Sequence, residues 1–152
     1  MALAPERFKL IASVYLVLTK DGKTLLSRRF RTGYEDGKYG LVAGHIEGKE
    51  TLRQALAREV REEAGVTLNV SDLALGHTMH RWCGDHERLD FFFTADTYVG
   101  TIVNKEPRKC DDIAWVPLDA LPENTIDYVR LAIENCVNKV EYSEYGWETF
   151  RE

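Results

Sequence analysis

Three glutamates in the middle of the chain have the spacing of a cation site. Glu59, Glu62 and Glu63 lie three and four residues apart, so on a helix they share one face. Clusters that offer only oxygen ligands suit hard cations such as Mg²⁺ or Mn²⁺ better than zinc. The same spacing also describes a solvated acidic face on a surface helix, where like charges repel. The residues around the glutamates distinguish between these two interpretations.

The segment 50–64, which carries these glutamates, is predicted to be a helix. It contains no glycine or proline and consists mostly of good helix formers, and Gly65 is placed to end it as a C-cap. On a helical wheel, Leu56, Val60 and Ala64 fall on an arc beside the acidic face. We therefore expect the helix to pack on a sheet through its apolar face and to present the carboxylates next to that contact.

The residues on either side of the glutamates complete a longer motif. Gly44 is followed after five residues by Glu50, and after seven more by Arg58, which begins the run REVREEAGV ending at Val66. This arrangement resembles the Nudix box, GX5EX7REUXEEXGU with U a bulky aliphatic residue, and every defined position matches. The order of the remaining segments, with strands after the box, an aromatic W-P turn and a closing helix, is also similar to that family.

The resemblance implies a fold, an activity and a cofactor. The fold would be α/β (α+β), an α/β/α sandwich with a central mixed β-sheet. The activity would be cleavage of a nucleoside diphosphate linked to another group, by attack of water at phosphorus, with Mg²⁺ or Mn²⁺ as the cofactor. The residues that bind the metal would be Glu59, Glu62, Glu63, Gly44 and, through its backbone carbonyl, Ala43.

The resemblance also implies roles for the other residues of the box. Arg58 would orient a box glutamate through a charge-assisted hydrogen bond, and Glu50 would support the loop or contact metal-bound water. Gly65 would end the helix. As the base that takes a proton from the attacking water, Glu62 is favoured. Because some family members use a glutamate outside the box, Glu106 is the preferred alternative.

Apolar and β-branched segments predict the sheet around this helix. A strand over 10–19 and another over 23–30 flank Asp21-Gly22, a pair typical of a hairpin turn. The chain has no internal repeat or low-complexity linker, so its 152 residues predict one layered domain covering 1–152. Further strands are expected at 39–43, 73–82, 88–98 and 113–117, and a second helix at 124–138.

Polar side chains on the predicted strands are candidates for binding the substrate. Arg28 and Arg29 are neighbours in one strand, so they are expected on opposite faces of the sheet, with one of them near the box. His80 and Arg81 are neighbours in the same way. Glu106, on a loop, completes this candidate set. Surface salt bridges for the arginines and a hydrogen-bonded structural role for the histidine are the alternatives.

Composition limits the partners. The net charge of −5 argues against a nucleic-acid polymer but is compatible with a small nucleotide, because a metal supplies positive charge locally. Three cysteines without CxxC spacing predict reduced thiols in a cytoplasmic protein. The N-terminal residues do not read as a signal peptide, and no apolar run is long enough to span a membrane. The aromatic tail EYSEYGWETFRE either packs on the body or forms a homodimer.

The preferred function is hydrolysis of a nucleoside triphosphate to the monophosphate and pyrophosphate, as in MutT-like family members. ADP-ribose, an ADP-sugar or a dinucleoside polyphosphate is the alternative substrate. A regulatory module that binds nucleotides without turnover is a second class of function, although such a module would normally lack a box glutamate. An isopentenyl diphosphate isomerase would need a catalytic cysteine, and neither Cys83 nor Cys110 has a convincing context for one.

Overall fold

The strand β1 (Ile11–Lys20) lies at the centre of the molecule and defines its two sides. The computed structural model describes residues 2–152. Residues 13–18 of β1 are all buried, because successive side chains of a strand point to opposite faces and this sheet is covered on both. The side chains that face one core are Val14, Leu16 and Leu18, and those that face the other are Tyr15 and Val17.

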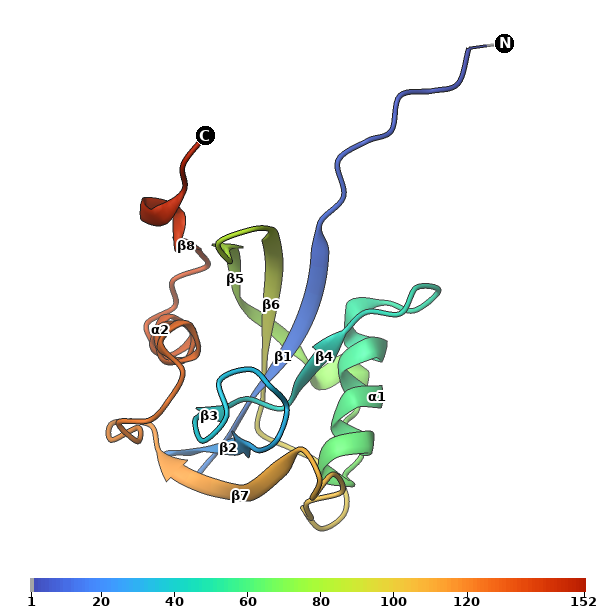
Figure 1. Ribbon diagram of the computed structural model, residues 1–152. Coiled ribbons are helices and arrows are strands. Elements are labelled where there is room, and N and C mark those ends of the chain that lie inside the picture. The colour runs from blue at the N-terminus through green and yellow to red at the C-terminus, as the bar shows by residue number, and fades with distance from the viewer. Residues whose placement is uncertain (1) are drawn as a thin grey trace.

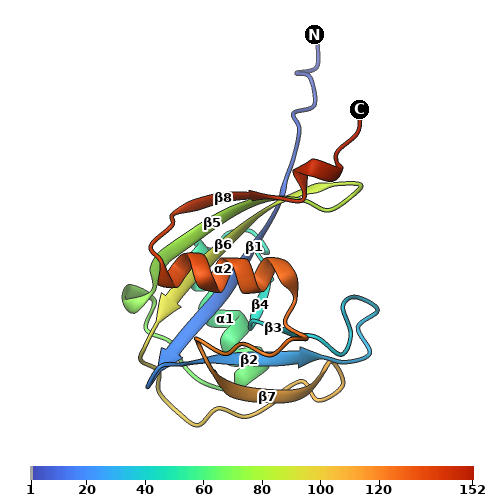
Figure 2. The same cartoon turned by 90° about the vertical axis from the view of Figure 1, so that its left-hand side faces the viewer.

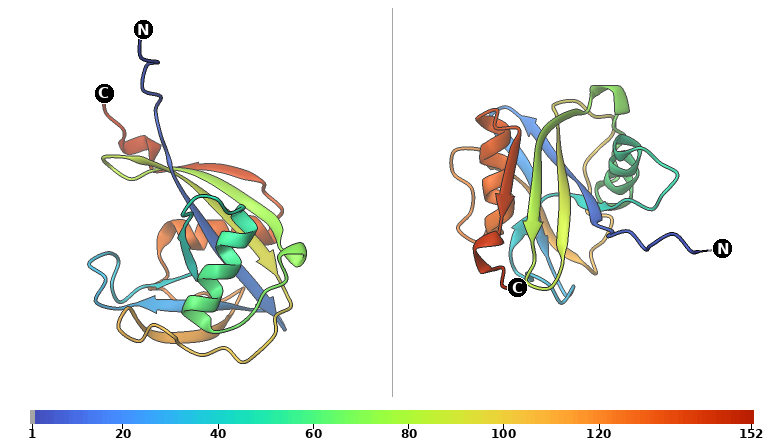
Figure 3. Two further views of the ribbon diagram at one scale, coloured as in Figure 1. Left: turned by 90° about the vertical axis from the view of Figure 1, so that its right-hand side faces the viewer. Right: turned by 90° about the horizontal axis from the view of Figure 1, so that it is seen from above.

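Two helices cover the opposite faces of the sheet (Figure 1). The helix α1 (Leu52–Ala64) packs Leu56 and Val60 against the first core, and α2 (Asp127–Val137) packs Val129 and Ile133 against the second. The two further views of Figure 3 show the sheet between the two helices. This arrangement confirms the predicted α/β/α sandwich with a central mixed sheet.

The sheet is mixed because β1 pairs in parallel with β6, and β5 with β8, whereas the other pairs are antiparallel. The order along the sheet is β3-β2-β1-β6-β5-β8, with β4 attached to β1 and β7 to β2. The strands after β1 are β2 (Lys23–Arg29), β3 (Tyr39–Gly40), β4 (Ala43–His45), β5 (Ala74–Trp82), β6 (Glu87–Ala95), β7 (Cys110–Pro117) and β8 (Tyr142–Tyr145).

The connection between β2 and α1 differs from the single strand predicted at 39–43. Tyr39–Gly40 pairs with β2, whereas Ala43–His45 pairs with β1, so the chain crosses from one strand to the other between them. Leu41 and Val42 are buried at this crossing, and the Leu16 N–H donates to the Val42 carbonyl at 3.0 Å. The crossing brings Ala43 and Gly44 next to α1.

The helix α1 begins two residues later than predicted. Thr51 is its N-cap, since the Thr51 side chain accepts a hydrogen bond from the Gln54 N–H while the Gln54 side chain accepts from the Thr51 N–H. Glu50 therefore precedes the helix. At the other end Gly65 has a φ of 72° and its N–H donates to the Arg61 carbonyl, which confirms it as the C-cap.

Several other boundaries also shift. The Asp21-Gly22 turn is confirmed, with positive φ at both residues. The strand β6 ends at Ala95 instead of 98, and β7 starts at Cys110 instead of 113. The helix α2 starts at Asp127 instead of 124 because the Ile126 N–H donates to the Tyr39 carbonyl, which holds this residue in an extended conformation.

The C-terminal tail packs on the body, one of the two alternatives expected for it. The strand β8 lies beside β5 at the edge of the sheet and is followed by a short 3-10 turn, Trp147–Thr149 (Figure 2). The Trp147 side chain donates to the His80 carbonyl at 3.0 Å. Among the residues described, no helix has the length and apolarity needed to cross a membrane.

Candidate active site

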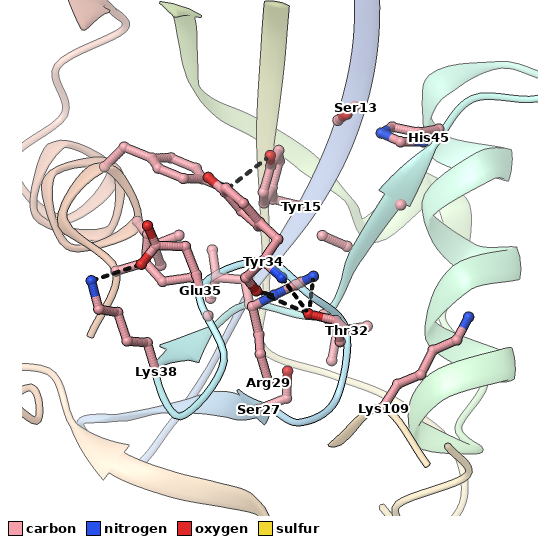
Figure 4. A pocket seen from close by; sticks show the side chains of 18 of the residues that line it. Ser13, Tyr15, Ser27, Arg29, Thr32, Tyr34, Glu35, Lys38, His45 and Lys109 are labelled. Carbon is pink, nitrogen blue, oxygen red and sulfur yellow. Dashed lines mark hydrogen bonds and ion pairs between the residues drawn. The ribbon is translucent and has the colours of Figure 1, made fainter. Parts of the chain in front are cut away.

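A cleft of about 1220 Å³ opens between the crossing segment after β3, the N-terminal end of α2 and the loop between β2 and β3. Figure 4 shows side chains that line it, with Tyr15 and Ser13 from β1, His45 from β4 and Lys109 from the loop before β7. Three box glutamates border the same cleft. The lining residues that come from the predicted site are Arg28, Arg29, Ala43, Gly44, Glu59, Glu62, Glu63, Arg81 and Glu106.

The three box glutamates differ in exposure. The side chain of Glu59 is 14% exposed and that of Glu62 is 53% exposed. Glu63 is held by the crossing segment, because its Oε2 accepts a hydrogen bond from the Ala43 N–H at 3.2 Å. Glu59 and Glu63 are therefore fixed against the loop that begins the box, whereas Glu62 reaches toward solvent.

Gly44 is a glycine because Glu59 occupies the space of its missing side chain. A Cβ built at Gly44 would lie 2.1 Å from Glu59 Cδ and 2.3 Å from Glu59 Oε1, well inside any real contact distance. Since Gly44 is paired with Val14 in the sheet, the backbone cannot easily move away. The close approach of this loop to the carboxylate explains why the first position of the box is a glycine.

Gly44→Ala is expected to push Glu59 out of place and to lower the melting temperature by only a few degrees, because the end of a flexible side chain can move away at a cost of about 1 kcal/mol. Turnover is expected to fall on the order of a hundredfold, since Glu59 is an expected metal ligand and its displacement would disturb the reacting geometry. Thermal unfolding and steady-state kinetics measure the two effects. Gly48→Ala is the control, because a Cβ there meets nothing within 4 Å, although its positive φ adds some strain. Equal activity of the two variants would refute this explanation.

Arg58 connects the loop to the helix. Its Nε and Nη2 donate to the two carboxylate oxygens of Glu50 at 3.1 and 2.8 Å, and its Nη1 donates to Glu59 Oε1 at 2.8 Å. Its Nη2 also donates to the His45 carbonyl at 3.3 Å. Glu50 in turn accepts from the Glu47 N–H. The loop before α1 is therefore held by the Glu50 carboxylate and by the Arg58 guanidinium. These contacts lower the pKa of Glu50.

The electrostatics of Glu59 and Glu63, which are both half-buried, favour a cation. Burial, followed by repulsion from Glu59 and by Glu106, raises the pKa of Glu63 to about 8. Burial also raises the pKa of Glu59, although hydrogen bonding from Arg58 opposes this shift. A hard divalent ion would lower the free-energy cost of holding these two carboxylates charged and close together. Their oxygen atoms are the kind of ligand that Mg²⁺ or Mn²⁺ prefers. Within residues 2–152 no three His, Cys, Asp or Glu side chains already converge on one point.

Both arginines of β2 border the cleft, and they have different partners. The pairing of β2 with β7 shifts between Arg28 and Arg29, because Asp111 is an extra residue on β7 at this point. Arg28 Nε donates to Asp111 Oδ1 at 2.7 Å. Arg29 donates to the Tyr34 carbonyl at 2.6 Å and lies over the Tyr34 ring. Opposite faces of the sheet for the two side chains stay a prediction.

His80 and Arg81 do lie on opposite sides of β5. Arg81 is in the wall of the cleft, where its side chain is 8% exposed and its Nε donates to the buried Asp90 at 2.7 Å. His80 Nε2 lies 2.8 Å from Glu87 Oε1, and its ring packs edge-on against Trp147, outside the residues that line the cleft. The structure thus places Arg81 where a substrate could reach it and gives His80 protein partners instead.

Some lining residues were not predicted from the sequence. Ser13 and Tyr15 lie in a strand recognised only as apolar, and His45 adjoins the box glycine without being part of the motif. A polar serine inside the run LIASVYLVLT was the one available signal, because it interrupts an otherwise buried strand. Tyr128 and Arg88 come from elements whose relation to β1 depends on the tertiary structure.

The fold and the glutamate-bearing helix together define a class of protein. The sequence model of the NUDIX domain matches residues 7–133. The chain therefore belongs to the Nudix family, which confirms the resemblance given by the box. The crystal structure of a MutT NUDIX hydrolase from Burkholderia pseudomallei is similar, with a TM-score of 0.76 and 25% identity, covering 84% of this chain and 98% of that one.

Curated relatives carry several different names. The chain is 32% identical over 114 residues to an NAD-capped RNA hydrolase NudC from Stutzerimonas stutzeri, covering 75% of this chain but 39% of the relative. It is 32% identical over 117 residues to an oxidized purine nucleoside triphosphate hydrolase from Danio rerio, covering 75% of this chain and 69% of the relative. This chain thus spans about two fifths of the length of the NudC relatives it matches.

Proposed function

We propose that this chain is a Mg²⁺- or Mn²⁺-dependent pyrophosphohydrolase that cleaves a phosphoric anhydride bond in a nucleoside diphosphate derivative. The observation that carries the proposal is the gathering of Glu59 and Glu63 against Ala43 and Gly44 at the edge of a nucleotide-sized cleft. The preferred substrate is a nucleoside triphosphate, with a nucleoside monophosphate and pyrophosphate as products. The name of the Danio rerio relative supports this choice.

The residues of the box would have different roles in binding the cation and in catalysis. Glu59, Glu62 and Glu63 would hold the cation, with Gly44 and the Ala43 carbonyl on the loop side. When bound, the cation neutralises the diphosphate and activates the attacking water. Glu62 or Glu106 would accept the proton of that water.

Other residues of the cleft would hold these groups and the substrate in place. Arg58 keeps Glu59 and Glu50 oriented through the hydrogen bonds described above. Arg28 and Arg29, at the rim of the cleft, would contact phosphate oxygens through their planar guanidinium groups.

A dinucleotide is the second candidate substrate. The cleft of about 1220 Å³ exceeds the roughly 300–1,000 Å³ that is usual for a small-molecule site, so it has room for more than one nucleotide. The name of the NudC relatives, NAD-capped RNA hydrolase, agrees with such a substrate, although the matched region covers only part of those proteins. This candidate shares the box chemistry and differs in what occupies the rest of the cleft.

A substrate panel tests the proposed function. Nucleoside triphosphates, ADP-ribose, a dinucleoside polyphosphate, NAD⁺ and an NAD-capped RNA are each incubated with Mg²⁺, with Mn²⁺ and with EDTA, and products are separated by chromatography. We expect pyrophosphate and a monophosphate from a triphosphate, only when a divalent cation is present. Two nucleoside monophosphates from NAD⁺ would instead favour the dinucleotide. Binding of nucleotides without cleavage of any of them would contradict the enzyme and favour a regulatory module.

A further inference from the structure

Two arginines face each other across neighbouring strands in the wall of the cleft. Arg81 of β5 is directly opposite Arg88 of β6 in the antiparallel register, and both line the cleft. Their side chains are 8% and 16% exposed, so neither charge is freely solvated. Like charges directly opposite each other destabilise a sheet. The pair therefore places two positive charges side by side in the wall of the cleft.

Among residues 2–152, one carboxylate is paired with the two guanidinium groups. Asp90 is fully buried, accepts from Arg81 Nε at 2.7 Å and from the Tyr15 hydroxyl at 3.1 Å, and has its other contact with Arg88 Nε at 3.8 Å. Two cations against one carboxylate leave a net positive charge at this place. Arg88 Nε is buried without a hydrogen-bond partner among residues 2–152. Part of the donor capacity of the pair is therefore unused.

The remaining contacts of the pair hold it in a fixed position. Arg88 Nη2 donates to Ser13 Oγ at 2.5 Å and to His45 Nε2 at 2.8 Å, and the Arg81 guanidinium lies 3.7 Å from the centre of the Tyr128 ring. Figure 4 shows Ser13 and His45 close together on β1 and β4. Within residues 2–152, the Nη1 group of neither arginine has a protein acceptor. Both are thus oriented by protein contacts while keeping donors for a ligand.

The acidic and basic groups lie on the two sides of β1. On one side β4 pairs with β1, and its Gly44 lies against Glu59, where a cation would bind a diphosphate. On the other side β6 pairs with β1 and carries Arg88, opposite Arg81, and their planar groups match the oxygens of a phosphate. A ligand that satisfies both sides carries a diphosphate and a second anionic group.

We propose that Arg81 and Arg88 form a second anion subsite, which selects substrates bearing a phosphate monoester in addition to the scissile diphosphate. This inference rests on the proposed function for the placement of the diphosphate, but the subsite itself can be tested without turnover. The substrate class would be a nucleoside diphosphate derivative phosphorylated on its ribose.

Matched nucleotides without an anhydride bond test the subsite, because nothing in them can be hydrolysed. Isothermal titration calorimetry in Mg²⁺ compares AMP with adenosine 2′,5′-bisphosphate and adenosine 3′,5′-bisphosphate, and GMP with its guanosine counterparts. We expect at least one bisphosphate to bind about tenfold more tightly than the monophosphate, the size expected for a charge-assisted contact. In Arg88→Gln this difference is expected to disappear, with the affinity for the monophosphate changed less than twofold.

Two controls make the result specific. Arg7→Gln removes the same charge from the exposed N-terminal segment and should keep the preference. Arg88→Lys keeps the charge without the planar group and should retain part of the preference for the bisphosphate. Thermal unfolding checks the fold, which should survive in Arg88→Gln because Asp90 keeps Arg81 and Tyr15.

Three results would overturn the second subsite. They are equal affinity for monophosphates and bisphosphates, no binding of any bisphosphate, and an equal loss of affinity for both kinds of ligand in Arg88→Gln. In the last case Arg88 would hold the 5′-phosphate itself. Selective binding of a bisphosphate by a chain that hydrolyses neither the substrate panel nor the ribose-phosphorylated dinucleotide NADP⁺ would instead contradict the proposed hydrolase and leave this subsite in place.

Discussion

Glu63→Gln is expected to stabilise the metal-free protein while reducing turnover about a thousandfold. The amide has nearly the shape of the carboxylate and its oxygen still accepts from the Ala43 N–H, but it carries no charge to bury. Loss of a metal ligand removes several kcal/mol of transition-state stabilisation, which corresponds to this decrease in rate. Opposite changes in stability and activity would separate a ligand role from a purely structural one.

The stability change should depend on pH. The folded-state pKa of Glu63, about 8, lies above the ordinary value of 4.5, so the folded state binds more protons than the unfolded state between these values. The contribution of Glu63 to stability is therefore fully present below pH 4.5 and is lost as the pH rises through 8. We expect the metal-free protein in EDTA to lose roughly 2 kcal/mol over this interval, or about 4–8 °C in melting temperature.

Thermal unfolding between pH 5 and pH 8 in EDTA measures this loss. The melting temperature of Glu63→Gln should change less with pH than that of the parent protein. The gain in stability of the variant over the parent should therefore be larger at pH 8 than at pH 5. Glu123→Gln, which removes a carboxylate from an exposed position, serves as the control and should follow the parent curve. If the melting temperatures of the parent and Glu63→Gln changed equally with pH, the charge on Glu63 would not destabilise the folded protein.

Glu62→Gln is expected to lower kcat by about 10²–10⁴-fold, the range typical of a lost general base, while leaving the fold intact. Its side chain is 53% exposed at the edge of the cleft, and the nearest cationic contact, Arg58 Nη1, is 3.6 Å away. It is therefore less constrained than Glu59 or Glu63 and better able to approach the attacking water. Steady-state kinetics at saturating substrate, repeated over a range of Mg²⁺ concentrations, measures the effect.

Glu106→Gln distinguishes between the two candidate bases. Glu106 borders the same cleft, on a loop in which its carbonyl accepts from the Lys109 and Cys110 N–H groups. If Glu62 is the base, Glu106→Gln should reduce kcat less than tenfold. The reverse order of effects would transfer the role to Glu106. A Glu62→Gln variant that regains full kcat at high Mg²⁺ would show that Glu62 only binds the cation.

The local motifs were predictable from the sequence because each depends on residues close together in the chain. The spacing of the box placed Glu59 and Glu63 on one helix face, and Gly65 ended that helix through its left-handed backbone conformation. The Asp21-Gly22 turn was likewise a local feature. The start of α1 was missed by two residues, although Thr51 followed by Gln54 is a recognisable capping pair.

The contents of the cleft depended on contacts between residues far apart in the chain. Alternation predicted that one of Arg28 and Arg29 would lie near the box, whereas both border the cleft. Ser13 reaches Arg88 only because β1 pairs in parallel with β6, which lies 75 residues further on. No periodicity within one segment contains that information, because strand register is set by side chains on both strands and by the layers that cover them.

The sequence by itself therefore determined the family, the α/β/α layering and the helix that carries the carboxylates, since these follow from local spacing and from which residues must be buried. Only the tertiary structure decided that the Glu59 side chain is 14% exposed and that of Glu62 is 53% exposed, because exposure depends on the loop that crosses beside α1. It also decided that Arg81 and Arg88 meet in one wall, since the pairing of β5 with β6 places them opposite each other.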